Sequence, residues 1–283
     1  MMLRRILLAS AGAIALAATA LAADLPSRAP PPVYLPPPPI FTWTGLYVGV
    51  NAGYGWGNNK SSNSFAPETD PTDPDPEVDE FFILSHPKLS GGFVGGGQIG
   101  YNYQFSPWLV AGIETDFQGT SLKGQSSGAG ASTNSPDHVL VATASSRLNW
   151  FGTVRGRIGV TPFDPHFLLY GTGGFAYGKV RRGITTADFE PEGDNDFGAA
   201  AFSNTRTGWT AGGGVEWAFL PGWSAKVEYL YTDLGGATTL LVPEGTGPIF
   251  NTFNIPATRF HTVRAGLNYH FNLWTPGPVV AKY

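Results

Sequence analysis

The sequence predicts an all-β fold, a transmembrane eight-stranded antiparallel up-and-down β-barrel with short turns at one end and long loops at the other. The clearest observation is a hairpin between Thr207 and Thr232, in which large apolar residues alternate with small or charged ones. A period of two is typical of strands and not of helices. The apolar face is broad and aromatic, whereas the charged face is rich in glycine. This polarity predicts an inside-out barrel with lipid outside and a narrow polar lumen inside.

Composition agrees with such a barrel. The chain has 283 residues, of which 38 are glycine and none is cysteine, and its formal net charge is −4. Charged residues make up 13% of it, about half of the roughly 25% usual in soluble proteins. The lack of cysteine excludes disulfide frameworks and thiolate metal sites. The negative balance gives no case for nucleic-acid binding.

Residues 1–22 have the pattern of a cleavable signal peptide. Arg4 and Arg5 precede an apolar run, which ends at the small-residue site Ala20-Leu21-Ala22. This pattern predicts cleavage between Ala22 and Ala23 and export of the mature chain. The apolar run is too short and too interrupted to be a good spanning helix.

Residues 23–41 form a proline-rich tether ahead of the barrel. Eight prolines fall between Asp24 and Ile40, a composition typical of a polyproline II spacer. A plain periplasmic spacer is the preferred interpretation. The alternative is a docking peptide for a periplasmic or cell-wall partner.

The barrel itself is expected over residues 42–271, with strands long enough for the roughly 9–11 residues of a tilted membrane strand. The predicted strands are Trp43–Gly57, Gly92–Phe105, Trp108–Phe117, Leu148–Thr161, Phe167–Val180, Thr207–Phe219, Trp223–Tyr231 and Arg259–Phe271. On the fourth strand, Leu148, Trp150 and Val154 are expected to face outward. The facing of Phe167–Val180 stays open because both of its faces carry large apolar residues and glycine.

The connections between these strands alternate in length. Ser106-Pro107, Thr161–His166 and Leu220–Gly222 are short, and proline with glycine suits the last of them to a tight turn. The long loops are Asn58–Ser90, Gln118–Arg147, Arg181–Arg206 and Gly235–Thr258. Short turns are therefore expected at the periplasmic end and long loops outside the cell.

The same alternation places four carboxylates and four cations inside the lumen. They are Glu114, Asp116, Glu216, Glu228, Arg155, Arg157, Lys226 and Arg264. Buried charges must be paired, so we expect an ion-pair plug, with a gated pore lining as the alternative. Glu114 and Asp116 are predicted to meet Arg155 and Arg157 across one strand boundary.

The remaining lumen charges are predicted to belong to the same network. Lys226 and Glu228 should join Glu216 across the boundary between the two hairpin strands, and Arg264 should reach the same group from the last strand.

Enzyme-like motifs are present but lack their structural context. Gly95–Gly100 matches G-x-G-x-x-G, yet a strand follows it and not a helix. Gly124–Gly128 matches a nucleophile elbow but lies in a predicted Ser/Gly/Ala loop, and Ser85–Lys88 matches S-x-x-K without partner motifs. The acidic stretch Glu68–Glu80 could attract Ca²⁺, but prolines interrupt it and the EF-hand glycine is absent. We therefore expect no enzyme activity, metal or cofactor.

Two segments resemble a known family. The opening F-T-W-T-G-L-Y-V-G-V-N-A-G-Y-G-W-G and the closing V-R-A-G-L-N-Y-H-F are similar to small outer-membrane immunogenic proteins of the OmpA-like barrel superfamily. The similarity covers about Trp43 to Phe271. It implies recognition of a terminal aromatic residue by the barrel-assembly machinery. Phe271 is the better match, with Tyr283 of the extension 272–283 as the alternative.

Together these features predict an integral protein of the bacterial outer membrane that has a structural and surface-antigen role and a charge-plugged lumen. Its expected partners are outer-membrane lipid and the assembly machinery. A narrow porin that passes small solutes or ions is one alternative. Ligand binding or adhesion through the long loops is the other.

Overall fold

The computed structural model describes residues 42–58, 63–69, 80–85, 87–132, 139–189, 195–235, 238–243, 250–255 and 257–271. The predicted signal peptide, nearly all of the tether and the extension 272–283 lie outside these residues, as do the side chains of the acidic stretch. In the part of the chain that the structure describes, no helix is long and apolar enough to cross a membrane.

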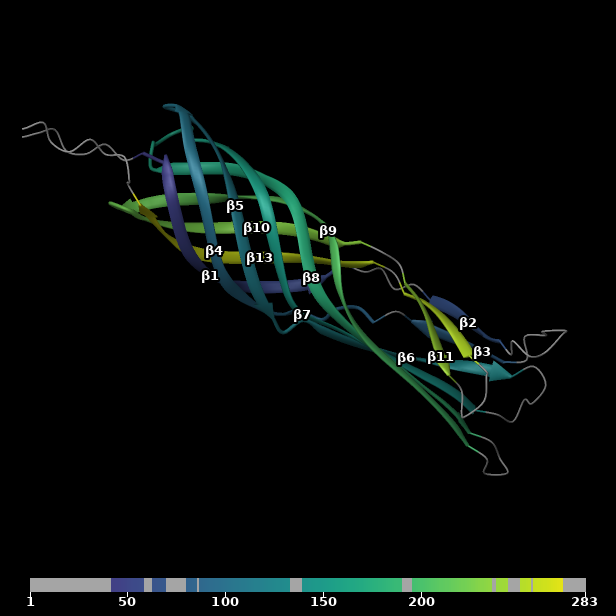
Figure 1. The fold of residues 1–283 in the computed structure, drawn as a ribbon. Coiled ribbons are helices and arrows are strands. Elements are labelled where there is room, and N and C mark those ends of the chain that lie inside the picture. Colours follow the sequence, from purple (N-terminus) through teal and green to yellow (C-terminus); the bar gives the residue numbers. More distant parts are fainter. Residues whose placement is uncertain are drawn as a thin grey trace, which may run out of the picture. The chain divides into compact units, whose positions relative to one another are not determined.

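Eight strands form a closed antiparallel ring, as the sequence predicts (Figure 1). They are β1 (Gly45–Gly57), β4 (Gly92–Ser106), β5 (Leu109–Thr120), β7 (Val139–Val160), β8 (Phe167–Phe189), β9 (Asp196–Leu220), β10 (Trp223–Leu234) and β13 (Thr258–Phe271). The ring closes where β13 pairs with β1, from Leu46 opposite Phe271 to Gly57 opposite Phe260. Closure leaves these eight strands without an unpaired edge between them.

Short turns join the strands at one end of the barrel. In Leu220–Gly222 the glycine has a φ of 77°, a left-handed conformation that side chains with a Cβ rarely adopt. In the turn 161–166, Asp164 accepts a hydrogen bond of 2.7 Å from the backbone N–H of His166. This bond lowers the pKa of the Asp164 carboxyl.

The other end of the barrel holds more strand than the sequence predicts. Five further strands lie within the predicted long loops: β2 (Asn63–Thr69), β3 (Glu80–Ser85), β6 (Lys123–Ser132), β11 (Thr238–Pro243) and β12 (Phe250–Ile255). In Figure 1, β7, β8 and β9 also run on past the ring. Their outer parts mix apolar and polar residues on both faces, with Val139 and Phe197 exposed and Arg182 buried, so no inside-out alternation marks them as strands in the sequence.

The outward face of the ring is an apolar band between two aromatic belts. The belt near the short turns contains Tyr101, Tyr103, Phe105, Trp108, Trp217, Phe219, Trp223, Tyr269 and Phe271, all exposed. The belt at the far end contains Tyr54, Trp56, Phe93, Phe117, Phe175, Trp209 and Tyr229, also exposed. Exposed Val50, Ile99, Ile113, Ile158 and Leu267 lie between them. Aromatic belts that flank an aliphatic band mark the two interfaces of a membrane barrel.

One predicted facing is wrong. Leu148 is fully buried in the lumen, because the ladder between β7 and β8 shifts between Leu148 and Trp150. Such a bulge inserts one residue and reverses which positions face inward. Beyond it the prediction holds, since Val154 is exposed and Arg155 is buried.

The facing that the sequence left open on β8 is also settled. Leu168, Tyr170, Ala176 and Val180 point into the lumen and are buried, whereas Leu169 and Phe175 are exposed.

Candidate functional site: the charged lumen

Glycines on the inner face make room for the lumen side chains. A Cβ built on Gly100 would overlap the Tyr47 ring, and one built on Gly49 would overlap the side chains of Asn268 and Gln98. The interior of an eight-stranded barrel is only just wide enough for side chains to fill it. Large polar side chains can therefore pack on the charged face only because glycines lie beside them.

Arg155 is the centre of the ion network. Its Nη2 lies 2.5 Å from Glu114 Oε1 and 2.9 Å from Asp116 Oδ2, and its Nη1 lies 2.8 Å from Glu228 Oε2. Arg155 itself is 1% exposed. The planar guanidinium can donate to several carboxylates in fixed directions, so one side chain joins three strands.

Two further cations complete the charge balance of this cluster. Arg264 Nη2 lies 3.1 Å from Asp116 Oδ2 and 2.6 Å from Glu228 Oε1. Lys226 Nζ lies 2.8 Å from Glu114 Oε2. Each of the three carboxylates thus contacts at least two cations.

Arg157 and Glu216 form the part of the network nearer the short turns. Arg157 Nη2 lies 2.7 Å from Glu216 Oε2. Glu216 Oε1 also accepts hydrogen bonds from Ser224 Oγ at 2.5 Å and from Asn268 Nδ2 at 2.7 Å. Tyr47 connects this part to the centre, since its hydroxyl donates to Glu114 at 2.7 Å and accepts from Arg157 at 2.9 Å.

The structure brings the eight predicted lumen residues together, with three changes of partner. Glu228 was predicted to join Glu216, but it contacts Arg155 and Arg264 instead. Glu114 lies directly opposite Arg155 in the β5–β7 ladder, as expected. Arg157 instead makes its short ion pair across the lumen with Glu216, and is 3.7 Å from Glu114. Lys226 lies opposite Glu216 in the ladder, but its Nζ contacts Glu114. Long side chains in a narrow bore reach non-adjacent strands, which cross-strand neighbours alone do not predict.

The network also contains two tyrosines and several amide side chains that the sequence-based prediction did not include. They are Tyr47, Tyr170, Asn51, Gln98 and Asn268. The Arg157 guanidinium lies 4.0 Å from the centre of the Tyr170 ring, a cation–π contact. Gln98 Nε2 donates to Asn268 Oδ1 at 2.7 Å, and Asn51 donates to Gln98. Tyr47, Asn51 and Gln98 share the inward parity of the charges, so the same alternation could have identified them.

An apolar cluster closes the lumen on each side of the ion network. On the outer side it consists of Leu89, Val94, Leu122, Leu148, Phe151, Ala176, Val180, Leu234 and Phe260. On the side of the short turns it consists of Trp43, Val110, Leu168, Tyr170 and Ala218. The Trp43 indole N–H donates to the Pro165 carbonyl at 2.8 Å, which holds the ring across that end.

The chemistry of the lumen is therefore that of fixed, mutually neutralised charges. In the described part of the chain, no group of three or more His, Asp or Glu side chains could hold a metal ion. Gly95–Gly100 lies within β4. Gly124–Gly128 lies within β6 and not in a loop as expected, and it has no strand–turn–helix context there either.

Comparison with known proteins gives consistent matches along the chain. Residues 7–271 match the family described as outer membrane protein beta-barrel domain. The 31 kDa outer-membrane immunogenic protein of Brucella melitensis biotype 1 is 41% identical over 271 residues, which are 95% of this chain and 100% of that protein. The 22 kDa outer membrane protein of Rhizobium leguminosarum bv. viciae is 32% identical over 70% of this chain and 67% of its own.

Among solved structures, the outer membrane protein OprG of Pseudomonas aeruginosa covers 81% of this chain and 97% of its own, with a TM-score of 0.42 and 12% identity.

Proposed function

This chain belongs to the outer membrane protein β-barrel family, and we propose from that premise that it is a non-enzymatic envelope protein with a closed lumen. Its barrel anchors the outer strands and loops at the cell surface, where they act as a surface antigen. The immunogenic relative that matches along its whole length supports this role.

The filled lumen is the observation that carries the proposal. An ion or solute would have to pass two apolar clusters and separate the Arg155 contacts with Glu114, Asp116 and Glu228. Separating buried ion pairs costs several kcal/mol. The network therefore acts as a structural plug that holds strands from opposite walls of the barrel together.

Planar bilayer recording distinguishes this closed barrel from the narrow porin, its competitor. Folded protein is identified by different migration of unheated and boiled samples in SDS gels. We expect such protein to give no reproducible conductance steps. Small, uniform steps whose size changes in Arg155→Ala or Glu114→Ala would refute the closed barrel and support the porin.

The proposal includes the route to the membrane. Residues 1–22 direct export, and cleavage leaves Ala23 as the first mature residue. Residues 23–41 serve as a periplasmic tether, with a docking peptide for a periplasmic or cell-wall partner as the alternative. Phe271 carries the assembly signal. Sequencing of the mature N-terminus tests the cleavage, and release by high salt without detergent would refute membrane insertion.

The assembly signal is tested separately by two variants. Phe271→Ala should reduce the heat-modifiable, folded fraction in the membrane, whereas deletion of Tyr283 should leave it unchanged. The reverse result would assign the signal to the extension 272–283.

A further inference from the structure

Three cations lie in one cross-strand row on the outward face of the barrel. Lys123 of β6 is directly opposite Arg147 of β7, which is directly opposite Arg181 of β8. All three are exposed. None of them forms an ion pair with another described residue. Directly opposite side chains have Cβ atoms about 5 Å apart, and like charges in such positions are destabilising.

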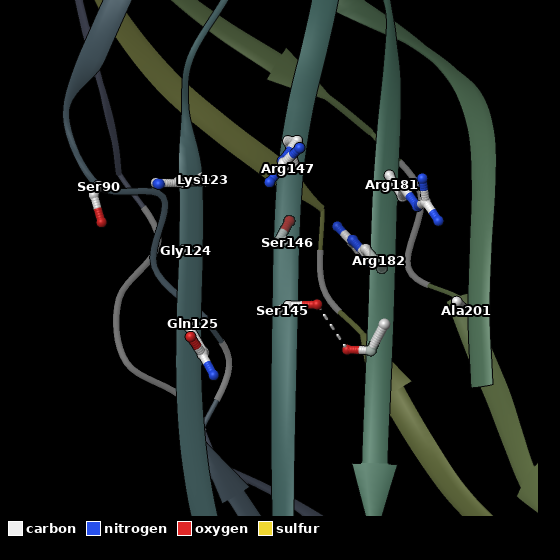
Figure 2. A pocket seen from close by; sticks show the side chains of 11 residues that line it. Ser90, Lys123, Gly124, Gln125, Ser145, Ser146, Arg147, Arg181, Arg182 and Ala201 are labelled. Carbon is white, nitrogen blue, oxygen red and sulfur yellow. Dashed lines mark hydrogen bonds between the residues drawn. The ribbon is translucent and has the colours of Figure 1, made fainter. Parts of the chain in front are cut away.

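A groove accompanies this row, which we call the cation row. Its cavity volume is about 650 Å³, within the range of roughly 300–1,000 Å³ of small-molecule sites. A second row lies two residues further along the strands. In it Gln125 is directly opposite Ser145, Ser145 is opposite Gly183, and Gly183 is opposite Ala201. Figure 2 shows Gln125, Ser145 and Ala201 beside the cations. The Ser145 hydroxyl donates a hydrogen bond of 3.4 Å to the Gly183 carbonyl. Among the described residues that line the groove, none has an acidic side chain.

The cation row lies just beyond the outer aromatic belt. Trp150 follows Arg147 by three residues on β7. The bulge between Leu148 and Trp150 brings both side chains to the outward face, less than about 10 Å apart along the strand. The Trp150 ring stacks on Phe117 at 5.3 Å and meets the edge of Tyr177 at 6.1 Å. Belts of this kind sit at the level of the lipid headgroups. The three cations are therefore at the depth at which the phosphates of the outer leaflet lie.

We propose that the cation row is a binding site for a phosphorylated lipid of the outer leaflet. Lys123, Arg147 and Arg181 bind its phosphates, because guanidinium and ammonium groups pair strongly with phosphate oxygens. Gln125 and Ser145 offer hydrogen bonds to polar headgroup atoms, and the aromatic surface of Trp150 receives the acyl chains. A bound phosphate would also offset the repulsion within the row. A soluble polyphosphate has no acyl chains to contact the aromatic surface. The dependence of binding on Trp150 therefore distinguishes a lipid from a soluble polyphosphate.

The test measures binding of phosphorylated lipid A to folded, detergent-solubilised protein. Neutralising the row in Lys123→Gln/Arg147→Gln/Arg181→Gln should weaken binding about 100-fold, since each cation near an anionic surface contributes roughly five-fold. The charge-retaining variant Lys123→Arg/Arg147→Lys/Arg181→Lys should bind within a few-fold of wild type. Equal binding by the wild-type and neutralised proteins would overturn the proposal.

A single substitution has a matched control. Arg147→Gln should weaken binding about five-fold, whereas Arg259→Gln should change it less than two-fold. Arg259 is an exposed strand arginine too, but it is paired with Asp233 at 2.8 Å. Equal losses would mean that the lipid responds only to net charge, which would refute the site.

Two further measurements distinguish a phosphorylated lipid from a soluble polyphosphate as the ligand of the cation row. Dephosphorylated lipid A should lose the preference for wild type over the neutralised protein. Inositol hexakisphosphate, a soluble polyphosphate, should bind more weakly than lipid A, and Trp150→Ala should weaken only the lipid. A soluble polyphosphate that binds as tightly as the lipid, with no effect of Trp150→Ala, would overturn the lipid assignment.

The effect of Arg147→Gln on the melting temperature should change sign when phosphorylated lipid A is added. In lipid-free neutral detergent, Arg147→Gln should raise it, because the substitution removes a like-charge pair on each side. With phosphorylated lipid A present, the same substitution should lower it relative to wild type, because the ligand stabilises the form that binds it. A lower melting temperature in both media would contradict this reasoning.

Discussion

Replacing Arg155 with leucine is expected to destabilise the barrel by about 3–5 kcal/mol, the usual cost of removing one partner from a buried ion pair. The substitution deletes contacts of 2.5, 2.9 and 2.8 Å to Glu114, Asp116 and Glu228. The carboxylates are not left alone, because Lys226 still contacts Glu114 and Arg264 still contacts the other two. This residual pairing keeps the expected cost near that range although three strong hydrogen bonds are lost.

The double-mutant cycle with Glu114→Gln isolates one of these contacts. The loss of unfolding free energy in the double variant Glu114→Gln/Arg155→Leu should be smaller than the sum of the losses in the two single variants. The difference, the coupling energy, should be about 0.5–3 kcal/mol. Urea unfolding in detergent, followed by tryptophan fluorescence, measures each free energy of unfolding.

The control is Arg259→Gln. That arginine is also ion-paired, but its side chain is 52% exposed, so its loss should cost far less than the loss of Arg155, because solvent screens an exposed pair. If Arg155→Leu costs no more than Arg259→Gln, or if the two members of the cycle are strictly additive, the lumen network does not stabilise the barrel as argued.

Three further substitutions test other parts of the fold by the same unfolding assay. Trp43→Ala removes a fully buried ring and the hydrogen bond to Pro165, and should cost about 3–5 kcal/mol; a cost below about 1 kcal/mol would mean that the ring does not close that end. Gly100→Val would overlap the Tyr47 ring and the Ile113 carbonyl, so about 1–3 kcal/mol or loss of the heat-modifiable form is expected; unchanged stability would contradict the packing. Gly222→Val places a branched side chain at a φ of 77° and should cost about 1–3 kcal/mol, whereas an unchanged midpoint would argue against the turn conformation.

The alternation of side chains was sufficient to predict most of the barrel. Lipid demands apolar residues outside, and the narrow bore demands glycine beside large polar residues inside, so the facing of β1, β4, β5 and β10 follows from parity alone. The outer parts of β7, β8 and β9 were not predicted because apolar and polar residues are mixed on both of their faces, which leaves no inside-out alternation. Leu148 was misplaced because one inserted residue in the ladder reverses parity without a mark in the sequence.

The sequence by itself determined the fold class, the closed ring and which charges share the lumen, because each depends on a local alternation that every strand repeats. Only the tertiary structure decided the partners of those charges. Arg157 contacts Glu216, and Lys226 contacts Glu114, across the bore and not along a ladder. The cation row is likewise a product of register, since Lys123, Arg147 and Arg181 become neighbours only after three strands align. Parity tells which face a side chain occupies, whereas register and bore width decide what it touches.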